Sequence, residues 1–234
     1  MVKTLNIAHR GFSGLYPENT MLAFKKAVET GASGIETDVH MTKDNIIVIC
    51  HDETIDRTTN GSGFIKDYTY SELRKFDAGN GQKIISLDEL LDYSKDKNIL
   101  VNIELKNNVI TYKGIEKRTI DKIYEYNMND HVILSSFNHN SMRKVKEYDS
   151  SIKTGLLYGT QIYNPWEYAK KMKADAIHPL FTLIMNRDII KNTKEHGISI
   201  NTYTVNDKAN MKKLMEFGVD GIITNYPNIF KKLI

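Results

Sequence analysis

The chain has 234 residues, of which 41% are hydrophobic and 26% charged, a composition typical of folded globular proteins and unlike that of disordered chains. Its 32 Lys and Arg residues exceed its 29 Asp and Glu residues by only three and form no basic block, so the charge does not favour a nucleic-acid partner. No apolar run approaches the roughly 18–20 residues that a membrane span needs.

The location is predicted from two further features of the sequence. The first residues turn polar too soon for a secretory signal, and the single cysteine, Cys50, excludes an internal disulfide. Both features favour a reducing compartment. We therefore expect one soluble domain over residues 1–234, located in the cytoplasm, with no low-complexity linker inside it.

Short apolar runs alternate with amphipathic stretches along the chain, which predicts a parallel α/β fold, either a (β/α)8 barrel or a doubly wound sheet. The predicted strands are Leu5–Ala8, Gly34–Val39, Ile46–Cys50, Ile99–Leu105, Val132–Ser135, Thr154–Leu157, Ala176–His178, Ile198–Thr204 and Gly221–Thr224. The predicted helices run from a cap at Asn19 or Thr20 to Gly31, from the capping box Ser86–Glu89 to Tyr93, from a cap at Asn138 to Tyr148, over Met185–Glu195, and from a cap at Asn206 to Gly218.

The second and third predicted strands form a hairpin. The connection between Val39 and Ile46 is too short for a parallel crossover, which needs about a dozen residues. A two-residue turn at Asp44-Asn45 would place Asp38 opposite His51 on an antiparallel ribbon. Without the return strand of this hairpin, eight βα units remain, and that number favours the TIM barrel.

Residues 52–85 follow the hairpin and do not continue the βα alternation. They contain several glycines and a short helical piece near Ser71–Phe76. We interpret this stretch as a small inserted cap on one face of the barrel.

Three carboxylates are predicted to lie on one rim, because functional side chains in parallel α/β folds gather at the carboxyl ends of the strands. Glu36 and Asp38 come from one strand and Glu104 from the next strand of the barrel. Three oxygen ligands without a cysteine suit Mg²⁺ or Ca²⁺ better than zinc. Alternatively, the three acids pair with Arg10 and Lys106 in a structural ion network.

Two histidines on the same rim are the candidates for acid–base chemistry, because imidazole titrates near neutral pH. His9 follows the first strand and His51 ends the hairpin. Arg10 and Lys106 are candidates for binding a phosphate, and they serve equally well as charge balance for the acids. His40 is expected on the opposite side of its strand from Asp38.

Aromatic side chains at later strand ends are candidates for an apolar substrate wall. Phe137 and Tyr203 occupy such positions, although each also suits an ordinary core. Cys50 is expected to alternate away from the site and to be a buried apolar side chain rather than a nucleophile.

Taken in order, the motifs of this sequence resemble those of the glycerophosphodiester phosphodiesterase family. The matching pieces cover nearly the whole chain: His9-Arg10-Gly11, Pro17–Thr20, Glu36–Val39, Thr42–Asp44, Val48–Asp52, Arg57–Thr59, Ser86–Glu89, Glu104–Lys106, Ser135–Phe137, Tyr203–Asn206 and Asp220–Thr224. Two departures stand out, because the family commonly has tryptophan in place of Tyr203 and often has aspartate in place of Asn225. The first departure bears on the apolar wall and hence on the preferred headgroup.

The resemblance implies a TIM barrel with a small insertion after the hairpin. It implies that Glu36, Asp38 and Glu104 bind one divalent cation, Mg²⁺ or Ca²⁺. It also implies that the two histidines are the catalytic acid and base and that Arg10 and Lys106 contact the phosphate of the substrate. The implied reaction is hydrolysis of a small glycerophosphodiester to sn-glycerol 3-phosphate and an alcohol.

Two other functions remain open at this point. A lysophospholipase D would use the same site with a more apolar mouth, although the sequence has no amphipathic membrane segment to support it. A non-catalytic phosphodiester-binding protein is also compatible with the fold, but it needs no pair of acid–base histidines. The sequence predicts no oligomeric state.

Overall fold

The computed structural model describes residues 4–234. Over this range nine strands form one sheet in the order β1-β9-β8-β7-β6-β5-β4-β2-β3, and pairing of β1 with β2 closes it. Eight of the strands in this range pair in parallel and make the barrel, while β3 pairs antiparallel with β2 outside it. The TIM barrel is therefore confirmed. The strands are β1 (Leu5–His9), β2 (Gly34–Met41), β3 (Ile47–Ile49), β4 (Leu100–Leu105), β5 (Val132–Ser136), β6 (Lys153–Tyr158), β7 (Ala176–Pro179), β8 (Ser199–Thr202) and β9 (Gly221–Thr224).

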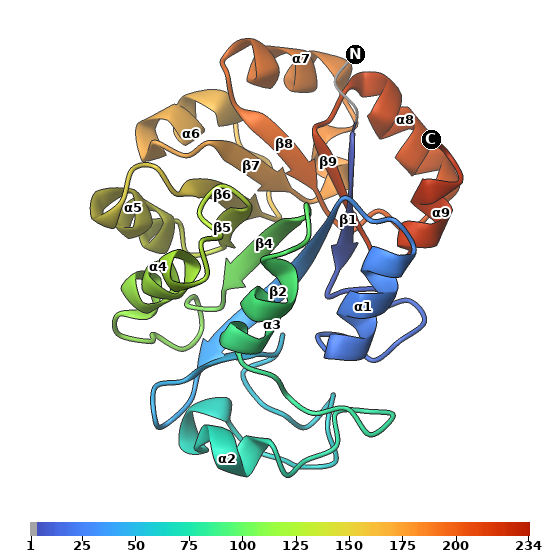
Figure 1. Cartoon of the computed structure of the whole chain (residues 1–234). Coiled ribbons are helices and arrows are strands. Elements are labelled where there is room, and N and C mark those ends of the chain that lie inside the picture. Colours follow the sequence, from blue (N-terminus) through green and yellow to red (C-terminus); the bar gives the residue numbers. More distant parts are fainter. Residues whose placement is uncertain (1–3) are drawn as a thin grey trace.

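Helices surround the barrel on the outside (Figure 1) and bury their apolar faces against it. In α1, for example, Phe24 and Ala27 are fully buried in the main core. The α-helices are α1 (Met21–Glu29), α2 (Tyr70–Leu73), α3 (Leu87–Ser94), α4 (Ile115–Glu125), α5 (His139–Tyr148), α6 (Pro165–Met172), α7 (Arg187–Glu195), α8 (Lys208–Phe217) and α9 (Pro227–Lys231), and the 3₁₀ turns are η1 (Ile65–Asp67) and η2 (Phe181–Ile184). Among residues 4–234, none of these helices has the length and hydropathy needed to cross a membrane.

Some of the predicted helix caps form and others do not. Thr20 caps α1, and Ser86 and Glu89 form the predicted capping box of α3. Asn138 precedes α5 but makes no capping hydrogen bond, because its side-chain amide donates to a backbone carbonyl in the loop after β4. The cap predicted at Asn206 is wrong, because the neighbouring Asp207 caps α8. The side-chain oxygen of Asn206 instead accepts from the backbone N–H of Asn225, the residue after β9.

The β2–β3 hairpin is shifted by one residue from the predicted register. Val39 pairs with Ile49, and the closing hydrogen bond leaves a three-residue turn instead of a two-residue turn. The last turn residue, Asn45, adopts a φ of +62°, a left-handed conformation that asparagine tolerates better than most residues. Asp38 therefore does not lie opposite His51, which follows the end of β3 and reaches the site from a loop.

Residues 52–85 connect β3 to α3, and we call them the cap segment. They lie beyond the arrowhead of β2, at the carboxyl end of the barrel strands (Figure 1). The helix predicted at Ser71–Phe76 is shorter and earlier, Tyr70–Leu73, because Thr69 and Glu72 form a capping box there. The segment has a small core of its own, made with the outer face of β3 by Val48, Cys50, Ile55, Ile65, Leu73 and Ile84.

Candidate active site

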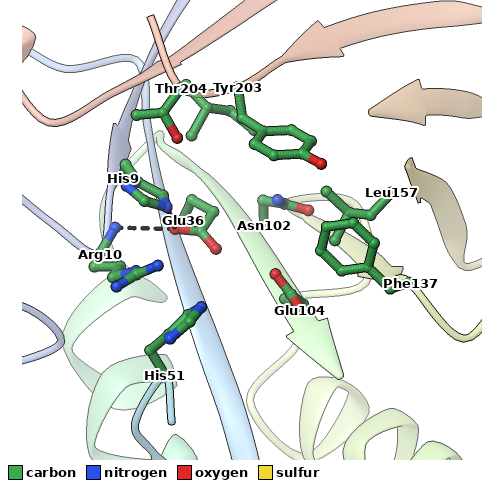
Figure 2. A pocket seen from close by; sticks show the side chains of 11 residues that line it. His9, Arg10, Glu36, His51, Asn102, Glu104, Phe137, Leu157, Tyr203 and Thr204 are labelled. Carbon is green, nitrogen blue, oxygen red and sulfur yellow. Dashed lines mark hydrogen bonds and ion pairs between the residues drawn. The ribbon is translucent and has the colours of Figure 1, made fainter. Parts of the chain in front are cut away.

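The register of the barrel strands places residues from β1, β2 and β4 at a similar level along the barrel axis. His9 lies beside Glu36, and Asp38 lies beside Glu104. Alternation along β2 points both of its acids to the same side. Residues that are 68 positions apart in the chain, such as Glu36 and Glu104, thereby face one cavity, as Figure 2 shows.

The three predicted acids form a compact buried cluster. One carboxylate oxygen from each of Glu36, Asp38 and Glu104 lies within 4.8 Å of the others, and each side chain is at least 90% buried. Glu104 Oε1 lies 3.0 Å from Lys106 Nζ but has no partner in hydrogen-bond geometry, so a buried acceptor remains available. This spacing and this donor set suit a hard divalent cation with oxygen ligands.

Burial and mutual repulsion perturb these carboxylates. Burial, then the charges of Asp38 and Glu104, raise the pKa of Glu36 well above its usual value. Burial and the charge of Asp38 raise the pKa of Glu104 to about 7. Burial alone would also raise the pKa of Asp38, but the nearby Lys106 and Arg10 outweigh it and lower that pKa. The two cations therefore do not fully compensate three ionised acids, and two of the carboxyl groups hold their protons to a higher pH than usual.

Arg10 and Lys106 flank the acids as the sequence predicts. Lys106 Nζ lies 3.8 Å from Asp38 Oδ1, and Arg10 Nε lies 3.5 Å from Asp38 Oδ2. The backbone N–H of Arg10 donates to Glu36 over 2.9 Å. The chain turns sharply here, since Arg10 has a φ of +53° and a Cβ on Gly11 would lie 2.7 Å from the backbone of Ala23. Glycine is therefore required at the second position of the turn.

Each candidate histidine is held through Nδ1 by a side-chain oxygen. His9 Nδ1 lies 2.6 Å from Asn225 Oδ1, and His51 Nδ1 lies 2.6 Å from Asp52 Oδ1. An oxygen acceptor at Nδ1 keeps the proton there and leaves Nε2 free on the other side of the ring. His9 Nε2 then lies 3.9 Å from Glu36, and His51 Nε2 lies 3.3 Å from Lys106 Nζ. Burial, together with the charge of Arg10, lowers the pKa of His9 to about 4.

The cavity that these groups line has a volume of about 170 Å³ and an apolar side. In Figure 2 Phe137, Leu157 and Tyr203 stand opposite His9 and His51, with Asn102 and Glu104 between them. The rings of Phe137 and Tyr203 meet edge to face with centroids 6.1 Å apart.

Sequence reasoning missed or misplaced several residues around the site. Asn225 stands out in the sequence only as a departure from the family pattern, yet its side-chain oxygen holds His9. Asn102 lines the cavity with a buried Oδ1 that has no partner, and the alternation of β4 (two residues before Glu104) was the available signal. The placement of His40 was wrong: it shares a strand face with Asp38, and its Nε2 lies 3.2 Å from the carbonyl of His51.

Cys50 behaves as predicted. It is 3% exposed in the small core of the cap segment, and burial raises the pKa of its thiol to about 12. It is therefore protonated at neutral pH and has no nucleophilic character there.

Comparison with known proteins identifies the family. The profile of the Glycerophosphoryl diester phosphodiesterase family matches residues 9–229, which is nearly the whole chain. The chain belongs to this family. Its members are phosphoric diester hydrolases, so this phosphodiesterase-family chain is an enzyme of that class.

Individual relatives agree with this assignment. A glycerophosphodiester phosphodiesterase of Caldanaerobacter subterraneus subsp. tengcongensis is 45% identical over 240 residues, which cover all of this chain and 98% of the relative. The structure of a phosphodiesterase from Oleispira antarctica in complex with the product sn-glycerol-3-phosphate is 28% identical, with a TM-score of 0.86 over 97% of this chain and 94% of that one. A glycerophosphodiester phosphodiesterase from Thermotoga maritima is also 28% identical, with a TM-score of 0.82 over 98% of both chains.

Proposed function

We propose that this chain hydrolyses glycerophosphodiesters to sn-glycerol 3-phosphate and an alcohol with the help of a divalent cation. The observation that carries the proposal is the acidic cluster of Glu36, Asp38 and Glu104 in the same cavity as His9 and His51. The names of the relatives and the product bound to the Oleispira antarctica enzyme support the same substrate class.

The acidic cluster fits a metal ion better than it fits an ion network alone. When all three carboxylates are ionised they exceed the two positive charges of Arg10 and Lys106 by one, and the raised pKa values of Glu36 and Glu104 show that this excess is unfavourable without a further cation. The available oxygen of Glu104 and the absence of cysteine from the cluster favour Mg²⁺ or Ca²⁺ over zinc. Such an ion, when bound, supplies positive charge to the phosphate oxygens as the transition state forms.

The chain's own cations and histidines account for the remaining chemistry. Arg10 and Lys106 bind phosphate oxygens and add to the stabilisation of negative charge. One of His9 and His51 takes a proton from the attacking oxygen at its unprotonated Nε2, and the other, as the imidazolium with both nitrogens protonated, gives its Nε2 proton to the leaving alkoxide. Asn225 and Asp52 hold the two rings so that each Nε2 faces the cavity.

The apolar side of the cavity suits the organic part of the substrate. We assign Phe137 and Tyr203 to a wall beside the glycerol or the alcohol group, where an aromatic face packs against carbon and hydrogen. We also propose that residues 1–234 act as one phosphodiesterase domain, with the cap segment covering part of the rim. We further propose a cytoplasmic location, which the single cysteine favours, and a small-molecule substrate rather than a nucleic acid, because the basic residues form no block.

The proposal is tested by assaying the purified protein on glycerophosphocholine and glycerophosphoethanolamine. Release of glycerol 3-phosphate is followed with glycerol 3-phosphate dehydrogenase, in EDTA and after addition of Mg²⁺ or Ca²⁺. Metal-dependent release supports the proposal. If folded protein releases no product with any ion, the proposal fails, and turnover of a dispersed lysolipid would then point to a lysophospholipase D.

A further inference from the structure

Arg57 of the cap segment joins two acidic residues that come from separate parts of the rim. Its Nε and one terminal nitrogen donate to both oxygens of Asp52 over 2.7 and 3.0 Å. Its two terminal nitrogens donate to both oxygens of Glu18 over 2.9 and 2.8 Å. The guanidinium thus makes two bidentate contacts at once, which only arginine can do because its donors form a planar fork.

Both acids lead directly to residues of the cavity. Asp52 accepts from Nδ1 of His51, and Glu18 accepts from a terminal nitrogen of Arg10 over 2.9 Å. On the far side, Arg10 and Lys106 both lie within 4 Å of Asp38, and Lys106 lies 3.3 Å from His51 Nε2. The contacts therefore form a closed ring of seven side chains around the site: His51, Asp52, Arg57, Glu18, Arg10, Asp38 and Lys106.

The position of Arg57 in this ring is one of support rather than of contact with the cavity. It does not line the cavity, and its side chain is about half exposed. Asp52 and Glu18 are themselves 29% and 20% exposed, so without a partner each can rotate toward water. A surface ion pair contributes little to stability, but fixing two acids in place has a direct effect on the groups that they orient.

We propose that Arg57 is a positioning residue for the hydrolysis, which through Asp52 fixes the tautomer and direction of the His51 ring and through Glu18 fixes the guanidinium of Arg10. This inference rests on the proposed function for its kinetic effect, but not for its effect on the ring of His51. The cap segment would then contribute to the reaction. Arg57 belongs to that segment, whereas the two groups that it orients, His51 and Arg10, follow the hairpin and β1.

The kinetic test compares Arg57→Gln with a matched control, Arg74→Gln. Arg74 is also a half-exposed arginine of the cap segment that pairs with an acid outside the segment, Glu89 of α3 at 3.1 Å, but it has no link to the cavity. We expect Arg57→Gln to lower kcat by about 10- to 100-fold and to raise KM, and Arg74→Gln to change neither. Because only part of the kcat effect acts through Asp52, Arg57→Gln is expected to lower kcat less in the Asp52→Asn background than in the wild type, and the remaining loss reports the route through Glu18 and Arg10.

A second measurement reads the ring of His51 without any substrate. Proton–nitrogen correlation spectra of protein labelled with ¹⁵N-histidine distinguish the two tautomers, and His51→Gln identifies the signal. In the wild type and in Arg74→Gln we expect His51 to have its proton on Nδ1, and in Arg57→Gln we expect a mixture of tautomers.

The inference is overturned if Arg57→Gln has the same kcat as Arg74→Gln, or if the signal of His51 is unchanged in Arg57→Gln. A wild type that releases no glycerol 3-phosphate overturns the proposed function instead. In that case the imidazole spectra still decide whether Arg57 fixes the His51 ring.

Discussion

Replacing Lys106 by methionine tests whether the acidic cluster is a metal site. Lys106 is 7% exposed, and its Nζ lies 3.0 Å from Glu104 and 3.8 Å from Asp38. Methionine keeps most of the apolar stem but removes the charge, so the excess of negative charge in the fully ionised cluster rises from one to two. Removing one partner of a buried ion pair costs about 3–5 kcal/mol. Since 1 kcal/mol shifts Tm by roughly 2–4 °C in a chain of this size, we expect Tm to fall by about 6–20 °C in EDTA.

A divalent ion should recover much of this loss. The ion binds the folded cluster and not the unfolded chain, and at 100 times its Kd it adds about 2.7 kcal/mol of stability. Without Lys106 the cluster attracts the ion more strongly, so addition of Mg²⁺ or Ca²⁺ should raise the Tm of Lys106→Met more than that of the wild type. The gap between the two proteins is then smaller with the ion than in EDTA.

Lys146→Met is the matched control. Lys146 is also buried, and it pairs with Asp175 at 2.6 Å, but that pair belongs to α5 and the chain before β7 and lies outside the cavity. Its variant should lose Tm equally with and without the ion. Thermal melts of the three proteins in EDTA, Mg²⁺ and Ca²⁺ make the comparison. If the ions raise all three Tm values by the same amount, or raise none, the acidic cluster is not a metal site that Lys106 helps to neutralise.

Three further outcomes are expected. His9→Ala and His51→Ala should each lower kcat by about 10²–10⁴-fold with an unchanged circular dichroism spectrum, and a near-wild-type rate in either would remove that histidine from the mechanism. Burial lowers the pKa of His178 to about 3. Below pH 6.5 the unfolded chain therefore binds a proton at His178 that the folded chain does not, and the free energy of unfolding decreases as the pH falls. From pH 7 to pH 5 the wild type should lose about 2 kcal/mol more than His178→Gln in urea unfolding, and parallel pH profiles would contradict this. Ser86→Ala should lower the free energy of unfolding by about 1 kcal/mol through loss of the α3 cap, without a change in kcat, and an unchanged urea midpoint would show that the cap contributes nothing.

Much of the candidate site follows from local sequence patterns. Short apolar runs ending in His9, Asp38 and Glu104 predict strands, and parallel strands in a barrel must present their carboxyl ends on one face. The short connection after β2 likewise predicts a hairpin that returns His51 to the same region. These predictions succeed because they depend on residue spacing within one element and on a general rule for how such elements assemble.

Other features depend on residues that are distant in the chain. The bond between His9 and Asn225 spans 216 positions and exists because β9 pairs with β1 when the barrel closes. The contact of Arg57 with Glu18 spans 39 positions and needs the cap segment to fold over the rim. Hydrophobic periodicity and helix-capping patterns near these residues do not predict either contact, because both patterns depend only on residues close together in the sequence.

The sequence by itself determined the order of the strands, five of the helices between them, a count of βα units that favours the barrel, and the residue types available at its rim, because hydrophobic period and cap chemistry are local properties. The tertiary structure decided the three-residue hairpin turn, which oxygen holds each catalytic candidate, and the contact of Arg57 with Glu18. These features depend on the free energy of closing the barrel and packing the cap segment. The register of a strand pair and the rotamer of a side chain are set by many contacts at once, most of them with residues distant in the sequence.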